Sequence, residues 1–132
     1  MFRDHQADKA VWDSACLCVF PGYGMSLKEL WQLVNAATGF DYPQVADLER
    51  LGERISTLAR LINVREGFAR TADTLPARNL VQPLLVGSAG GQVVDLEPML
   101  DEYYRIMGWD SKGVPTSERL KELGLFDMPG AS

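Results

Sequence analysis

The chain has 132 residues, of which 46% are hydrophobic and 23% are charged, and its net charge is −5. This length and this share of apolar residues suit one globular domain with a hydrophobic core of its own. The negative charge argues against a surface that neutralises phosphates or anionic lipids, so nucleic acid and membrane are not expected partners. The sequence has neither the apolar centre of a secretory signal nor the roughly 20 apolar residues of a membrane span. A soluble, cytoplasmic protein is therefore expected.

Both cysteines, Cys16 and Cys18, lie in the short stretch DSACLCV. Two cysteines at this spacing do not make a disulfide framework, and reduced thiols suit the cytosol. Buried packing, a redox pair and a metal site all stay open from these residues alone. A structural zinc or an iron–sulfur cluster needs about four ligands, and His5 is the one other plausible soft ligand here. A metal site would therefore need ligands from another segment.

The first predicted helix covers residues 26–39, SLKELWQLVNAATG. Ser26 is a typical N-cap, and Glu29 follows three residues later, which together form a capping box. The apolar residues of this segment recur at three- and four-residue steps, and Gly39 is suited to the C-terminal end.

A long helix is predicted over residues 42–67 because one apolar stripe runs through this segment. The stripe consists of Val45, Leu48, Leu51, Ile55, Leu58 and Ile62. Gly67 is suited to the end of this helix. Gly52 lies inside it, where glycine costs about 1 kcal/mol relative to alanine. Close contact with another helix and a merely tolerated glycine are both open explanations.

Residues 68–95 contain prolines and glycines and have no sustained hydrophobic period. They predict a long loop, with a short strand at residues 92–94, and loops of this length in compact domains are often functional.

The last third of the chain predicts a helix over residues 96–108 and a short helix over residues 117–124. Thr116 or Ser117 can cap the short helix, and residues 126–132 are expected to form a flexible tail. The predicted fold class is all-α, an irregular helical bundle with long loops.

Four stretches together resemble the C-terminal part of the aldehyde ferredoxin oxidoreductase family, which are tungsten or molybdenum pterin enzymes. They are DSACLCVF (13–20), SLKELWQLVNAATG (26–39), RLGERISTLARLINVREGFARTADTLPAR (50–78) and VVDLEPMLDEYYRIMGWDSKGVPTSERLKELGL (93–125). The resemblance implies that residues 1–132 form a single helical region, a fragment of a larger oxidoreductase. It also implies that residues 1–25 face the cofactor.

The family carries a segment with the pattern D-x-x-G-L-C, and residues 13–18 follow that pattern with one departure. The resemblance implies that Asp13 hydrogen-bonds a pterin, that Leu17 contacts it, and that Cys18 is one thiolate ligand of a 4Fe-4S cluster. A carboxylate accepts hydrogen bonds from pterin N–H groups, and a thiolate is the usual ligand of cluster iron. Cys16 stands where the family usually has glycine, so it inherits no role. Whether its backbone keeps the glycine conformation is an open question.

The implied reaction of the complete enzyme is the oxidation of an aldehyde to a carboxylic acid at a tungsten (or molybdenum) bis-pterin. Electrons would leave through the 4Fe-4S cluster to ferredoxin. The implied partners are the N-terminal cofactor-binding part of the same enzyme, ferredoxin and the aldehyde, and a homodimer is a further option. No catalytic residue is indicated, and the isolated chain is expected to bind no cofactor and to be inactive, because one thiolate cannot replace four. The alternative is a non-enzymatic helical interaction module that has lost the cofactor domain.

Polar residues are concentrated in the stretch NVREGFARTAD, from Asn63 to Asp73. The resemblance suggests that this region lies near the cofactor or the substrate channel. The favoured explanation is structural, with Arg54, Arg60 and Arg65 in ion pairs with Glu53, Glu66 or Asp73.

A fragment of a larger enzyme should expose surface that its other part covers. We therefore expect an apolar patch around Leu17, Val19 and Phe20. The three tryptophans, Trp12, Trp31 and Trp109, are expected in the core or in an interface.

Overall fold

The computed structural model describes residues 2–18 and 20–126, and all regular elements in these ranges are helical. The α-helices are α1 (Phe2–Ser14), α2 (Leu27–Thr38), α3 (Val45–Arg65), α4 (Ala77–Val81), α5 (Leu96–Met107) and α6 (Ser117–Glu122). The 3-10 turns are η1 (Phe20–Tyr23) and η2 (Arg70–Ala72). The predicted all-α class is confirmed. The predicted tail at residues 126–132 lies, apart from Phe126, outside the described residues.

The long loop predicted over residues 68–95 is interrupted by two short helical elements, η2 and α4, and the short strand predicted at residues 92–94 is wrong. This segment is extended only as a connection to α5. The Gln92 carbonyl accepts from Leu84 N at 3.2 Å, and Val94 N donates to the Asn79 carbonyl at 3.0 Å. These bonds join different partners and do not continue along a neighbouring extended segment, so no ladder forms.

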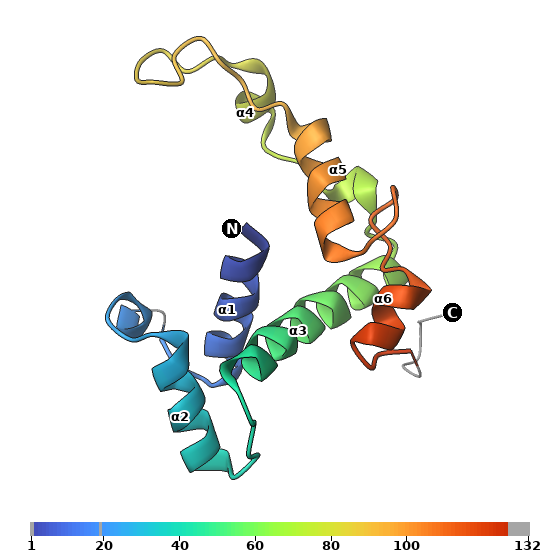
Figure 1. The fold of residues 1–132 in the computed structure, drawn as a ribbon. Helices are drawn as coiled ribbons and strands as arrows, with labels where there is room; N and C mark the ends of the chain where they lie inside the picture. The colour runs from blue at the N-terminus through green and yellow to red at the C-terminus, as the bar shows by residue number, and fades with distance from the viewer. Residues whose placement is uncertain (1, 19, 127–132) are drawn as a thin grey trace.

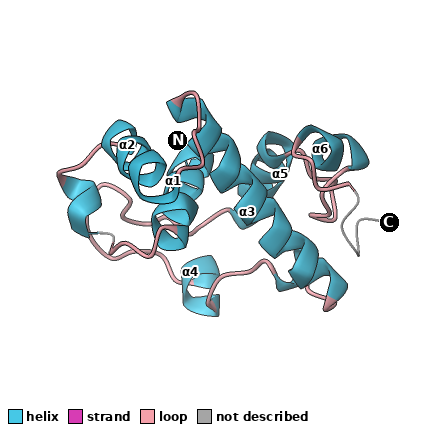
Figure 2. Cartoon of the chain, turned by 90° about the horizontal axis from the view of Figure 1, so that it is seen from below, coloured by secondary structure: helices cyan, strands magenta, loops and turns pink. Residues whose placement is uncertain are grey.

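The long helix α3 forms the axis of the molecule (Figure 1). Helices α1 and α2 lie beside its first half, and α5 and α6 lie toward its other end (Figures 1 and 2). Three small clusters of buried residues result, rather than one large core. They are Val11, Trp12, Leu30 and Leu48; Leu61, Leu120, Leu123 and Leu125; and Tyr104, Met107 and Trp109.

Helix α1 was not predicted from the sequence, and it makes the closest packing of the structure. Ala7 of α1 is buried against Gly52 of α3. A Cβ atom on Gly52 would lie 2.8 Å from Ala7 Cα and 2.6 Å from Ala7 C, distances that real Cβ atoms do not show. The close contact that Gly52 suggested is therefore confirmed, and its partner is α1.

The apolar stripe predicted for α3 is correct only in the first half of the helix. Leu48 is completely buried, but Ile62 is 46% exposed and its neighbour Leu61 is buried instead. Thr57 and Arg60 are also buried. The buried face changes along α3 because its neighbours differ. Helices α1 and α2 pack on its first half, whereas α6 contacts it from Arg50 to Leu61 and the turn before α6 accepts from Arg60 (Figure 2).

The predicted helix ends are confirmed where local capping defines them. Ser26 N donates to Glu29 Oε2 at 2.7 Å, and Glu29 N donates back to Ser26 Oγ at 3.4 Å, which completes the capping box. Gly39 ends α2 in the left-handed conformation. Thr116, rather than Ser117, caps α6 by accepting from Arg119 N at 3.2 Å.

The tryptophans contribute to packing, as expected. Trp12 and Trp109 are buried. Trp31 packs against the cluster around Leu48, and its Nε1 donates to the Tyr42 carbonyl at 2.8 Å. Across the described residues, none of the helices combines the length and the apolar character that crossing a bilayer requires.

Candidate functional site

The stretch DSACLCV forms the C-terminal cap of α1. Leu17 N donates to the Trp12 carbonyl at 3.2 Å, and Cys16 N donates to the Asp13 carbonyl at 3.1 Å. Cys16 has a φ of 55°, in the left-handed region. These two bonds with a left-handed residue at that position define a Schellman motif.

Helices α3, α5 and α6 end in the same motif, and each has glycine at the left-handed position. These residues are Gly67, Gly108 and Gly124. Cys16 occupies the equivalent position in α1, and the family pattern also has glycine there. The glycine conformation is therefore kept at Cys16 although the side chain is not glycine.

Replacing Cys16 with glycine is expected to stabilise the chain by about 0.5–1 kcal/mol. The left-handed conformation costs a residue with a Cβ roughly 1–2 kcal/mol, and the greater freedom of glycine in the unfolded chain cancels part of that gain. The measurement is urea unfolding of Cys16→Gly against the unsubstituted chain.

The control is Gly67→Cys, which reverses the change at the end of α3. Gly67 has a φ of 89° and no atom within 4 Å of the added Cβ, so only backbone strain is expected to act there. It should destabilise by a similar amount. Equal stability of Cys16→Gly and the unsubstituted chain would contradict the strain at Cys16.

The three predicted cofactor-contacting residues all lie on the surface. Asp13, in the last turn of α1, is exposed and pairs with Lys9. Leu17 is 36% exposed, and Cys18 is an exposed free thiol. Cys16 is likewise an exposed free thiol, so packing does not explain it.

The apolar patch expected beside these residues is present where the structure describes it. Phe20 is 75% exposed, and Tyr23, whose ring centre lies 6.3 Å from that of Phe20, is 84% exposed. Val19, which was expected in the same patch, lies outside the described residues.

A large open hollow of about 1570 Å³ lies between α1, α3 and α5. Asp13 and Ser14 line it where α1 ends, and Met99 and Leu100 of α5 contribute apolar surface. Leu17 and Cys18 are not among its lining residues. The structure therefore brings Asp13, but not the other two predicted residues, to the wall of this hollow.

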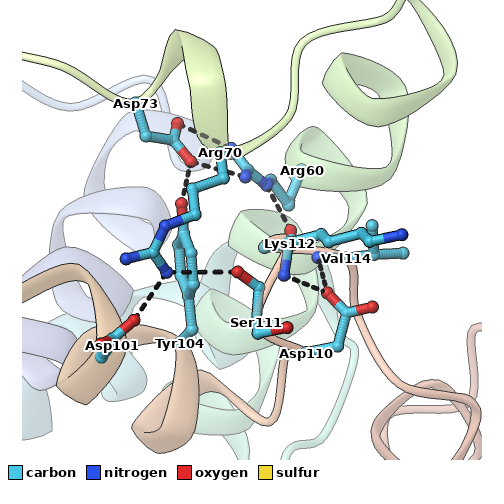
Figure 3. A network of polar contacts seen from close by, with 10 residues as sticks. Arg60, Arg70, Asp73, Asp101, Tyr104, Asp110, Ser111, Lys112 and Val114 are labelled. Carbon is cyan, nitrogen blue, oxygen red and sulfur yellow. Dashed lines mark hydrogen bonds and ion pairs between the residues drawn. The ribbon is translucent and has the colours of Figure 1, made fainter. Parts of the chain in front are cut away.

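Another part of the wall is a polar network around Arg60 (Figure 3). The Arg60 guanidinium donates to both carboxylate oxygens of Asp73, at 2.8 and 2.6 Å, and its Nε donates to the Gly113 carbonyl at 2.7 Å. Tyr104 Oη also donates to Asp73. The guanidinium carbon lies 5.0 Å from the ring centre of Trp109, a cation–π distance.

Burial and charge fix the protonation states in this network. Burial disfavours the charged form of Arg60, but the hydrogen bonds and the charge of Asp73 outweigh it and raise the pKa of Arg60. Burial would raise the pKa of Asp73, yet the hydrogen bonds from Arg60 and Tyr104 hold it below its usual value. Burial, together with the Asp73 carboxylate, raises the pKa of Tyr104 to about 12. At neutral pH the network thus holds an arginine cation, a carboxylate and a neutral phenol.

A second arginine connects η2 to α5 and to the turn that follows α5. Arg70 contacts Glu97 at 2.5 Å and Asp101 at 2.6 Å, and it donates to the Ser111 carbonyl at 3.2 Å. These contacts were not predicted, although the spacing of Glu97 and Asp101 places both on one side of a helix and indicates a shared cation.

The ion pairs predicted around Asn63–Asp73 are confirmed in part. Arg60 pairs with Asp73, and Arg65 pairs with Glu66 at 3.1 Å on the surface. The prediction for Arg54 is wrong, because its guanidinium donates to the Leu123 carbonyl. Glu53 forms an ion pair with Arg119 instead, at 2.5 Å, because α6 packs beside this part of α3.

The donor groups at the end of α1 can supply one ligand of an iron–sulfur cluster but not a complete ligand set. Cys18 is an accessible thiol at the end of a well-defined cap. Among residues 2–18 and 20–126, however, no group of three or more His, Cys, Asp or Glu side chains is arranged to hold a metal. Arg60, Asp73 and Tyr104 satisfy one another's polar groups and therefore act in folding rather than as open ligands, whereas Nε1 of the neighbouring Trp109 is buried without a hydrogen-bond partner.

Comparisons with known proteins identify the family of this chain. The family described as "Aldehyde ferredoxin oxidoreductase, domains 2 & 3" matches residues 1–125. The tungsten-containing aldehyde ferredoxin oxidoreductase of Pyrococcus horikoshii is 41% identical over 120 residues, which are 90% of this chain and 20% of that enzyme. The "Aliphatic sulfonate oxidoreductase, WOR-like subunit" of Pyrococcus furiosus is 30% identical over 128 residues.

A solved structure has the same helical arrangement. It is the "Active site complex BamBC of Benzoyl Coenzyme A reductase in complex with 1,5 Dienoyl-CoA", with a TM-score of 0.61 and 26% identity. The match covers 76% of this chain and 14% of that one. The chain spans about a fifth of the length of the curated relatives. By its match to domains 2 and 3 over residues 1–125, the chain belongs to the aldehyde ferredoxin oxidoreductase family.

Proposed function

We propose that this chain acts as the C-terminal helical part of a tungsten-pterin aldehyde oxidoreductase. Family membership supports the enzyme class. The cap of α1 is the observation that carries the proposal, because the backbone of residues 13–18 keeps the left-handed position that the family pattern provides with glycine. When bound, the pterin metal would supply two-electron oxidation of an aldehyde, and a 4Fe-4S cluster would pass the electrons to ferredoxin.

In this proposal Cys18 provides one thiolate to the cluster. The Schellman motif fixes the backbone up to Leu17, so the chain leaves α1 at Cys18 in a defined direction. The other three thiolates come from the remaining part of the enzyme. On this basis the isolated chain is inactive.

Asp13 orients the pterin by accepting hydrogen bonds from its ring N–H and amino groups. In the chain as described, this carboxylate pairs with Lys9, and both side chains are largely exposed. Exposed ion pairs of this kind contribute less than about 1 kcal/mol, so the pair is readily exchanged for a buried hydrogen-bonded partner. Leu17 adds apolar contact next to it.

The two cysteines of this chain provide a matched test. The chain is combined with the N-terminal portion of a tungsten-containing aldehyde ferredoxin oxidoreductase, ending where the match to this chain begins. Cys18→Ala is expected to lower aldehyde-dependent viologen reduction at least 100-fold and to lower the iron content. Cys16→Ala is expected to keep the activity and the iron content, because the thiol that it removes has no proposed role as a cluster ligand.

The outcomes separate the possible explanations. Full activity and full iron content in Cys18→Ala would contradict the role of Cys18. Loss in both variants would indicate damage to the cap rather than loss of a ligand. A stable chain that forms no complex with the N-terminal portion would instead favour the non-enzymatic interaction module.

A further inference from the structure

An apolar arm, residues 81–93, projects from the helices between α4 and α5 (Figure 1). Its largest side chains are open to solvent: Leu85 is 95% exposed, Val86 is 83% exposed and Val81 is 70% exposed. Residues 79–94 contain no charged side chain, although 23% of the chain is charged. A local cluster of aliphatic side chains without charges is typical of the buried centre of an interface.

The arm has a defined backbone. Gly91 N donates to the Leu84 carbonyl at 2.9 Å, and Gly90 N donates to the Gly87 carbonyl at 3.0 Å, which closes the tip. At the base, Val94 N donates to the Asn79 carbonyl at 3.0 Å. A closed tip presents its aliphatic side chains without a large loss of conformational entropy on binding.

We infer that the apolar arm docks onto the part of the oxidoreductase that lies outside this chain, and this inference rests on the proposed function. The chain spans only about a fifth of the length of its curated relatives. The arm projects away from α1 and α2 (Figure 1), so it would form a second contact beyond the one expected at Leu17 and Phe20.

Two other occupants fit the observations less well. A second copy would need a contact of roughly 800 Å² on each partner, and a few aliphatic side chains at a narrow tip provide far less. The same tip can contribute to a larger interface, in which other surfaces provide the rest of the buried area. A membrane surface is disfavoured because the flanking charged residues, Arg78 and Asp95, cancel and provide no basic cluster.

The test measures binding, so it does not depend on a loaded enzyme. The chain is titrated by calorimetry with the N-terminal portion of a tungsten-containing aldehyde ferredoxin oxidoreductase. Leu85→Ser and Val86→Ser are each expected to weaken binding more than tenfold, because each removes an aliphatic side chain from a buried contact. Leu33→Ser is the control, since Leu33 is an aliphatic residue of α2 that is 50% exposed.

Hydrogen exchange provides a second readout. Complex formation is expected to slow exchange of the amides in residues 84–92, and this would support the inference together with the binding losses. Both arm variants should unfold at the temperature of the unsubstituted chain, because their side chains contact little within it. A fold defect therefore cannot produce the expected result.

Failure of the inference is distinguishable from failure of the proposed function. If the unsubstituted chain binds and the arm variants bind equally well, the arm inference is overturned and the proposed function stands. If the unsubstituted chain does not bind, the proposed function is contradicted and the inference with it. If the unsubstituted chain and Leu33→Ser form a dimer but the arm variants do not, a second copy of the chain occupies the arm. That result would overturn the inference.

Discussion

Gly52→Ala is expected to destabilise the chain by about 2 kcal/mol, although alanine is the better helix former. Helix propensity alone would stabilise the protein by about 1 kcal/mol. The added Cβ would, however, lie 2.6 Å from Ala7 C and 2.8 Å from Ala7 Cα, and backbone atoms cannot rotate away as a side chain can. Helix α1 must therefore move off α3, which disturbs the buried contacts of Val11 and Trp12. Overpacking of this kind costs typically 1–3 kcal/mol.

In thermal unfolding, this effect is expected to lower Tm by about 8 °C. Ala59→Gly is the control, because Ala59 lies on the same helix and is exposed. It tests propensity alone and should destabilise by about 1 kcal/mol. If Gly52→Ala stabilised the chain instead, the close approach of α1 and α3 would be contradicted.

Asp73→Ala is expected to cost about 3 kcal/mol, because it leaves the buried Arg60 guanidinium without its counter-charge. The Arg60 side chain is only 8% exposed, and the Asp73 carboxylate accepts hydrogen bonds from both terminal nitrogens of Arg60. Removing one partner of a buried ion pair typically costs 3–5 kcal/mol. The lower end applies here, since Asp73 is itself 25% exposed and the Gly113 carbonyl still accepts from Arg60. The Tyr104 hydroxyl loses its acceptor as well.

The matched control is Glu66→Ala, which removes the partner of Arg65. Both side chains of that pair are 58% exposed, so the change in the free energy of unfolding should stay within about 0.5 kcal/mol. Urea unfolding of the two variants gives the comparison. A loss below 1 kcal/mol for Asp73→Ala would mean that water solvates Arg60, and would contradict the buried network in Figure 3.

The network holds the segment after α3, which contains the short turn η2, against α3 and α5. Arg60 belongs to α3, Asp73 to the loop and Tyr104 to α5, so one carboxylate joins three segments. Gly113 completes the contact, because a Cβ there would lie 2.9 Å from Tyr104 Cζ. The favoured structural explanation for the polar stretch Asn63–Asp73 agrees with these contacts at Arg60 and Asp73. The assignment of that stretch to the cofactor or channel stays a prediction.

The sequence predicted helices α2, α3, α5 and α6 because their signals are local. A capping box at Ser26 and a glycine after each helix satisfy backbone groups within a few residues, whatever the rest of the chain does. Helix α1 was missed because its buried residues are few and charged residues separate them. The stretch 13–18 was found through the family pattern, and the roles of Asp13, Leu17 and Cys18 remain predictions.

By itself, the sequence determined the helical class, the ends of the capped helices and the family. Only the tertiary structure decided which face of α3 is buried along its length, that Gly52 meets Ala7, and that Asp73 joins Arg60 to Tyr104. It also decided that residues 81–93 project with their aliphatic side chains uncovered. The physical reason is the range of the interactions. Capping and periodicity act over a few residues, whereas the faces on which helices meet depend on partners distant in the chain, and no local pattern encodes that choice.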